Sequence, residues 1–218
     1  MTPHRRTHTL ALAIALVTLS LSARPAHAAE IQKSGPEVFP GKFTVGFHPI
    51  GVQVAFEGRS TGGYKLDADF AALLKSMDKM SIWLGGGLSY ANPSYSCSVA
   101  FAGCAHDIGF RVFVRITLEK LLKIPLVPYV EAGLGGDILA YASQAGGGSN
   151  LGGGVPLRVG GGIHYWLLKN LGVGLETNFA FGPGIYPAVG SINCGGANTT
   201  CIGFYGNWDF LLGARFAF

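Results

Sequence analysis

Four cysteines carry the most reactive side chains of this chain. Cys97 and Cys104 have six residues between them, and so do Cys194 and Cys201. This spacing matches no zinc-ligand pattern, and neither pair forms a Cys-x-x-Cys redox motif. We therefore predict two local disulfides, Cys97–Cys104 and Cys194–Cys201, formed in an oxidising compartment. Pairing between the two segments stays open, because four cysteines allow three connectivities.

Hydroxyl side chains near a histidine are a second candidate for chemistry. Ser94, Ser96 and Ser98 precede His106 and Asp107, and acyl-transfer enzymes use these residue types. Their spacing fixes no pair of nucleophile and base, so we predict no catalytic residue and no enzyme activity.

Four runs of glycine invite comparison with phosphate-binding loops. They cover residues 85–87, 147–149, 152–154 and 160–162. A nucleotide-binding loop needs a following helix with Lys and Ser or Thr at its start, and none follows these runs. We predict that they serve close packing and loop conformation, and we expect no cofactor and no metal.

The charged side chains follow a period of two residues. Between residues 107 and 118, Asp107, Arg111 and Arg115 share one parity, whereas the other parity is Ile, Phe, Val and Leu. The same division recurs in residues 64–75, 80–90, 126–141, 156–167, 171–181 and 204–218. Such alternation is typical of β-strands with one apolar and one polar face.

These segments predict an all-β fold, an eight-stranded antiparallel up-and-down transmembrane β-barrel. The eighth strand, Phe43–Glu57, changes its apolar parity near Pro49 and Gly51, which indicates a β-bulge. Each strand has about ten residues or more, enough to cross the hydrocarbon of a membrane.

The predicted connections differ in length at the two ends of this barrel. If both termini are periplasmic, that side has the short turns 76–79, 119–124 and 169–170. The opposite side has the connections 58–63, 91–106, 142–155 and 182–202, three of which are long. This asymmetry is typical of bacterial outer-membrane barrels.

The first residues predict export from the cytoplasm. Arg5 and Arg6 precede the apolar residues 10–19, and Ala26-His27-Ala28 offers a cleavage site. The alternative is a membrane anchor, but the apolar stretch is shorter than a spanning helix. We therefore predict a cleaved signal peptide at 1–28, a periplasmic segment at 29–41 and the barrel at 42–218.

Composition excludes one class of partner and favours a membrane. Without residues 1–28, 13 basic residues face 12 acidic ones, so there is no basic surface for nucleic acid. Only 13% of the chain is charged, which favours a membrane environment. In lipid, a closed β-barrel is a structure in which strands satisfy all backbone hydrogen bonds.

The charged face is predicted to line the lumen and the uncharged face to contact lipid. A soluble lipid-carrying barrel, which would bury the apolar face, is the alternative. Mixed signs on the charged face favour a narrow, ion-paired interior, since eight strands enclose only enough room for side chains. The predicted lumen network consists of Lys65, Asp67, Asp69, Arg111, Arg115, Glu131, Asp137, Arg158, Glu176, Asp209 and Arg215.

Two motifs resemble a known family. The alternating last strand, which ends in Phe216 and Phe218, is similar to the C-terminal assembly signal of small eight-stranded outer-membrane β-barrels of Gram-negative bacteria. Residues 128–135, PYVEAGLG, resemble a strand of the same family, which includes the OmpA transmembrane domain, OmpX, OmpW and the opacity proteins. The resemblance covers about residues 42–218.

This resemblance implies a bacterial outer-membrane protein that is a monomer. The implied partners are outer-membrane lipid, lipopolysaccharide and, during assembly, the insertion machinery that reads the terminal Phe. We predict a structural, membrane-stabilising barrel with a plugged lumen. The alternatives are a narrow channel for small or apolar solutes and a surface adhesin or recognition protein.

Overall fold

The computed structural model describes residues 41–57, 59–92, 105–119, 122, 124–142, 149–187 and 200–218. They belong to the compact unit Pro36–Phe218. The predicted signal peptide at 1–28, the segment 29–40 and the side chains of the four cysteines lie outside the described part. Within the described residues, no helix is long and apolar enough to span a membrane.

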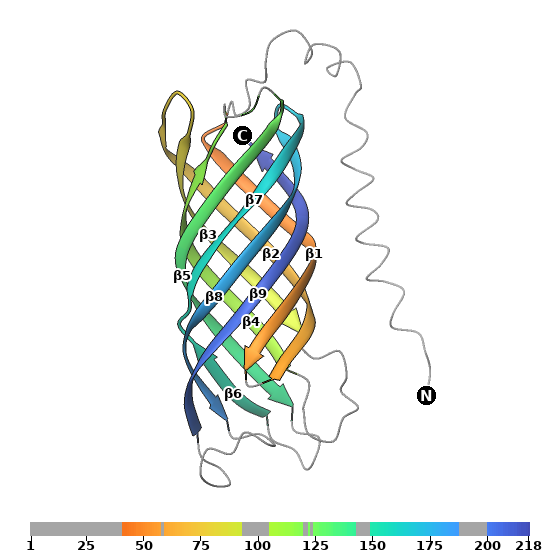
Figure 1. Ribbon diagram of the computed structural model, residues 1–218, viewed down its shortest axis with the longest axis vertical. Helices are drawn as coiled ribbons and strands as arrows, with labels where there is room; N and C mark the ends of the chain where they lie inside the picture. Colours follow the sequence, from red (N-terminus) through yellow and green to blue (C-terminus); the bar gives the residue numbers. More distant parts are fainter. Residues whose placement is uncertain are drawn as a thin grey trace, which may run out of the picture. The chain divides into compact units, whose positions relative to one another are not determined.

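The described strands form one antiparallel sheet that closes on itself (Figure 1). Closure comes from β1, which pairs with β2 on one side and with the last strand, β9, on the other. The strands are β1 (Phe43–Glu57), β2 (Arg59–Ser76), β3 (Ser81–Asn92), β4 (Ala105–Thr117), β5 (Leu126–Ala142), β6 (Ser149–Gly154), β7 (Leu157–Leu168), β8 (Leu171–Pro187) and β9 (Thr200–Ala217).

Strands β6 and β7 together make one of the eight positions in the wall. Both pair with β5 on one side and with β8 on the other. The interruption falls at Val155 and Pro156, and proline has no amide hydrogen to donate to a ladder. The Pro156 carbonyl still accepts a hydrogen bond from the Gly135 amide at 2.9 Å. The predicted eight-stranded antiparallel barrel is confirmed.

The bulge predicted in the first strand is also confirmed. The register of β1 shifts between His48 and Val52 against β2, and between Phe47 and Ile50 against β9. Both shifts include Pro49, which is the extra residue. The bulge lets Phe47 and Ile50 both face outward while His48 faces the lumen.

The predicted bounds of the connections on the side opposite the short turns are partly wrong, because the strands extend into them. Arg59 pairs with Glu57, so a tight hairpin replaces the loop 58–63. Residues 149–154 form β6, and β8 and β9 remain paired as far as Pro187 and Thr200. Gly and Pro in these segments suggested loops. Pairing with neighbouring strands supplies enough backbone hydrogen bonds to keep the segments extended.

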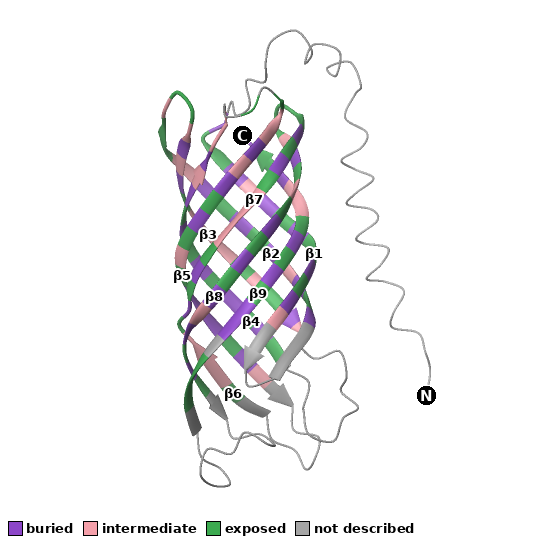
Figure 2. Cartoon of the chain, in the orientation of Figure 1, coloured by how far each residue is buried: buried purple, intermediate pink, exposed green. Residues whose placement is uncertain are grey.

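Burial alternates along the strands in the sense opposite to a water-soluble protein (Figure 2). Outward apolar side chains are exposed, such as Phe110 at 53% and Leu175 at 64%. Lys65, Asp67 and Arg115 are buried in the interior. The uncharged face is therefore the outer surface of the barrel.

Candidate functional site

The predicted lumen charges all lie inside the barrel. All eleven are buried, and the most exposed of them, Glu131, is 7% exposed. They come from β2, β4, β5, β7, β8 and β9, whose alternate residues point inward. Lys75 shares their parity but lies exposed near the end of β2.

A first group of ion pairs centres on Asp69. Its two carboxylate oxygens accept hydrogen bonds from Nη1 and Nη2 of Arg215, both at 2.8 Å. Arg115 Nη1 donates to the same carboxylate at 3.1 Å, and its Nε and Nη2 donate to Glu131 at 2.9 and 2.7 Å. Gly46 leaves the room, because a Cβ there would collide with Asp69 and Arg215.

A second group centres on Arg111. Its guanidinium forms two hydrogen bonds with Asp67, and the Nη2–Oδ1 distance is 2.8 Å. The same guanidinium lies 3.8 Å from Glu176 and 3.9 Å from Glu131. Arg111 therefore links the carboxylates of β2, β5 and β8 across the lumen.

Two neutral side chains complete the coordination of Glu176. The Tyr129 hydroxyl donates to Oε2, and the Asn178 amide donates to Oε1 at 2.6 Å. Tyr129 also carries the guanidinium of Arg115 over its ring, 4.8 Å from the centroid. Such a contact adds a cation–π attraction to the ion pairs.

His48 lies fully buried between two carboxylates. Its Nδ1 is 3.6 Å from Asp67, and its Nε2 is 3.4 Å from Glu176. Gly213 on β9 permits this position, since a Cβ at that residue would meet the imidazole. We call His48, the four carboxylates Asp67, Asp69, Glu131 and Glu176, and the arginines Arg111, Arg115 and Arg215 the central cluster.

A further set of charges, the outer cluster, lies nearer the end of the barrel with the long connections. It comprises Lys65, Asp107, Asp137, Arg158 and Asp209. The Lys65 ammonium is 2.6 Å from Asp209, and the Gln53 amide donates to Asp107 at 3.4 Å. Arg158 donates to Asp137 and lies 4.0 Å from Asp209.

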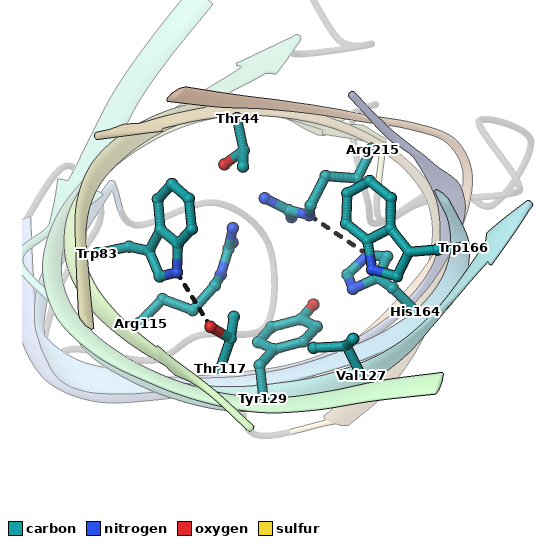
Figure 3. Close-up of a pocket in the computed structure, with 9 residues that line it drawn as sticks. All are labelled: Thr44, Trp83, Arg115, Thr117, Val127, Tyr129, His164, Trp166 and Arg215. Atoms are coloured by element: carbon teal, nitrogen blue, oxygen red, sulfur yellow. Dashed lines mark hydrogen bonds between the residues drawn. The ribbon is translucent and has the colours of Figure 1, made fainter. Parts of the chain in front are cut away.

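Aromatic side chains narrow the lumen beside the central cluster (Figure 3). The register places Trp83 and Trp166 near the end with the short turns. Trp83 and Trp166 stand on opposite walls, with Arg115 and Arg215 between them. The Trp83 indole donates to Thr117 at 3.0 Å. The cavity left among these residues has room for about one water molecule.

Several lumen residues were not predicted from the sequence. His48, Gln53, Tyr129 and Asn178 all contact charged partners, and Trp83 narrows the barrel. Their inward parity was the available signal for Tyr129, Asn178 and Trp83. His48 lies next to the bulge, where the apolar parity of β1 changes. Alternation alone therefore does not show whether its side chain faces the lumen.

The predicted assembly signal lies at the closing seam between β1 and β9. The backbone of Phe218 exchanges two hydrogen bonds with Phe43, each 3.0 Å, and the two rings lie 6.1 Å apart. Phe216 lies on the outer surface, and its backbone faces Val45 and Leu171 in the two neighbouring strands.

Three buried groups have the spacing of a metal site, but the site is already filled by protein. Ligand atoms of His48, Asp69 and Glu176 lie within 4.8 Å of one another. Arg215 Nη2 is 2.8 Å from Asp69 and 3.8 Å from Glu176, so a cationic nitrogen already sits against both carboxylates. A metal cation there would face strong repulsion from this guanidinium.

The histidine of the predicted hydroxyl cluster has another partner. His106 Nδ1 lies 2.7 Å from the Tyr90 hydroxyl, and the two rings stack 5.9 Å apart. Ser94, Ser96 and Ser98 lie outside the described residues. His106 thus forms an exposed hydrogen-bonded pair with Tyr90.

No family model and no curated protein matches the chain. Among solved structures, it is similar to Neisserial surface protein A, NspA, with 12% identity and a TM-score of 0.58 over 81% of this chain and 97% of NspA. It is also similar to the outer membrane protein OprG of Pseudomonas aeruginosa, with 12% identity and a TM-score of 0.50 over 83% of this chain and 97% of OprG. The chain therefore has the fold of small outer-membrane β-barrels, in agreement with the fold that the sequence predicts.

Proposed function

We propose that this protein is a structural outer-membrane barrel whose lumen is plugged by its own ion pairs. Its function is to occupy and stabilise the membrane rather than to conduct solutes or catalyse a reaction. Its partners in this role are outer-membrane lipid and lipopolysaccharide, with the insertion machinery during assembly. The protein acts as a monomer.

The observation that carries this proposal is the burial of the lumen charges. Side chains that line a water-filled pore keep contact with water, whereas these are at most 7% exposed. A buried charge without a partner costs several kcal/mol, so such charges persist only when they pair. Here the central cluster and the outer cluster pair charges inside the lumen, between adjacent strands or strands separated by one strand.

The exterior supports placement in a membrane. The outward faces of β4 and β9 carry Phe110, Val112, Phe210 and Leu212, each more than 40% exposed, and no charge lies among them. In water this surface would be far larger than the apolar patches of soluble proteins. In lipid it is the ordinary outer surface of a barrel.

The cell-surface connections are proposed to be closed by the two local disulfides, Cys97–Cys104 and Cys194–Cys201. Mass spectrometry of unreduced peptides from the folded protein tests this pairing. The expected result is two linked peptides, each from a single connection. A peptide that links the two connections would contradict it.

Liposome swelling with small sugars tests the plugged lumen. Vesicles with the folded protein are expected to swell no faster than vesicles without it. A large outer-membrane porin provides the positive control for insertion and swelling. Swelling that depends on solute size would instead support the alternative function, a narrow channel.

A further inference from the structure

We propose that His48 is a buried imidazolium whose proton completes the charge balance of the central cluster, so that loss of this proton loosens the lumen. The inference goes beyond the proposed function, because it applies to the lumen whether or not the barrel conducts. It rests on the contacts of one histidine and on the charges around it.

The first argument is the position of the two ring nitrogens. Nδ1 faces an oxygen of Asp67 at 3.6 Å, and Nε2 faces an oxygen of Glu176 at 3.4 Å. A neutral imidazole has one N–H donor and one lone pair, so one nitrogen would turn a lone pair toward a carboxylate. An imidazolium has a donor on each side. Neither nitrogen has another hydrogen-bond partner, and the side chain is fully buried.

The second argument is that all four carboxylates of the central cluster accept hydrogen bonds. Asp67 accepts from Arg111, Asp69 from Arg215 and Arg115, and Glu131 from Arg115. Glu176 accepts from Tyr129 and Asn178. Hydrogen bonds from guanidinium groups favour the ionised form of Asp67 and Asp69, each of which accepts at least two of them. With all four carboxylates ionised, four negative charges would face three arginines, so the cluster needs one proton to balance them, and the position of the imidazole between Asp67 and Glu176 assigns that proton to His48.

No other group of the described lumen supplies that charge. Lys65 is engaged with Asp209 at 2.6 Å, and His164 lies 3.4 Å from Nε of Arg215 as a hydrogen-bond acceptor, which requires a neutral ring. At this level β3 contributes the glycines 85 and 87. Besides His48, the buried titratable and charged groups of the described lumen are Lys65, Asp67 and Asp69 from β2, Asp107, Arg111 and Arg115 from β4, Tyr129, Glu131 and Asp137 from β5, Arg158 and His164 from β7, Glu176 from β8, and Asp209 and Arg215 from β9.

The consequence is that the stability of the contacts within the central cluster depends on pH. While His48 is protonated, it bridges Asp67 on β2 and Glu176 on β8. When pH rises and the proton leaves, the cluster keeps an excess negative charge and one carboxylate faces a lone pair. The bridge between β2 and β8 is therefore present while the proton is bound and is lost when the proton leaves.

Nitrogen-15 NMR of histidine-labelled protein in detergent micelles tests the protonation state directly. At neutral pH we expect both ring nitrogens of His48 to resonate as N–H, whereas His164 shows one unprotonated nitrogen. The variant His48→Gln assigns the signal by its loss. A neutral tautomer of His48 at neutral pH would overturn the proposal, and this readout on the wild type needs no variant to be stable.

Urea unfolding at neutral and alkaline pH tests the consequence. The wild-type midpoint is expected to fall toward alkaline pH, and His48→Gln is expected to have a lower midpoint at neutral pH that no longer falls. His164→Gln is the matched control, since it changes the other lumen histidine and should keep the fall.

The double variant His48→Gln/Glu176→Gln separates charge balance from simple loss of a side chain. It restores three negative charges against three arginines, so its midpoint should exceed that of His48→Gln alone. A double variant that is less stable than either single variant would mean that His48 contributes packing rather than charge, and the proposal would fail.

Discussion

Arginine rather than lysine dominates the central cluster, and the geometry explains why. Arg215 presents two parallel N–H donors to Asp69, and Arg115 spans two carboxylates with three donors. A guanidinium provides five donors in one plane, whereas an ammonium is a compact point charge. In a space this narrow, one arginine can satisfy several acceptors without water.

Removal of one carboxylate from this cluster tests its contribution to stability. Glu131→Ala is expected to lower the free energy of unfolding by about 3 kcal/mol, because it leaves Arg115 with a buried charge and one fewer partner. Lys75→Ala removes a charge of the same parity from an exposed position and should change stability by less than about 0.5 kcal/mol. Urea unfolding in micelles measures both values. Equal effects would show that burial of the charge is not what matters.

Sequence parity indicates which charges enter the lumen but not which of them meet. Lys65 and Asp209 are far apart in the chain, and their 2.6 Å contact depends on the register of two pairings, β2 with β1 and β1 with β9. Tyr129 was visible as an inward residue, yet its bond to Glu176 depends on the register of two pairings, because both residues lie opposite Gly162 of β7. Which side chains become partners depends on how the strands are aligned in the closed barrel. Alternation within separate strands does not determine this alignment.

Among the elements, β1 is the strand whose irregularity shapes the lumen. Pro49 is the extra residue, so that Phe47 and Ile50 both face lipid on either side of the bulge. The sequence showed a change of parity here. It did not show that the change would bring His48 between two carboxylates, because their positions depend on β2 and β8.

Single-residue deletions test the account of the bulge. Deletion of Pro49 keeps every other side chain of β1 on its present face, so the protein should still fold, as judged by heat-modifiable migration on gels. Deletion of Phe110 from the regular strand β4 turns Arg111 and Arg115 toward lipid at a cost of about 2–4 kcal/mol each and should prevent folding. Failure of the first variant together with success of the second would contradict the assigned register.

The seam between β1 and β9 is where the barrel closes. Deletion of Phe218 removes two backbone hydrogen bonds to Phe43 and the contact between their rings. Assembly into lipid vesicles should therefore become slower, as measured by the rate at which the protease-resistant form appears. Phe204→Ala is the control, because it removes an exposed ring of β9 away from this seam. An unchanged rate without Phe218 would exclude it as an assembly determinant.

At the largest scale, the described barrel is organised inside out, with its apolar side chains on the surface and its charges in the interior. The alternation of the strands was sufficient to predict this arrangement and the closed sheet of eight positions. It did not predict β6, because SNLGGG has no apolar alternation and pairs only in the company of β5 and β8. A prediction from residue composition therefore ends the strands too early, because glycine-rich segments at their ends still pair in the barrel.

Single-channel recording in a planar bilayer is the most direct test of the plugged lumen. A large porin added to the same bilayer verifies that conducting barrels are detected. The wild-type protein is predicted to give no steady conductance above the leak of the membrane, because its lumen charges are paired and buried. A stable open level in the wild type, with an ion selectivity that Glu131→Ala alters, would contradict the plugged barrel and establish a channel.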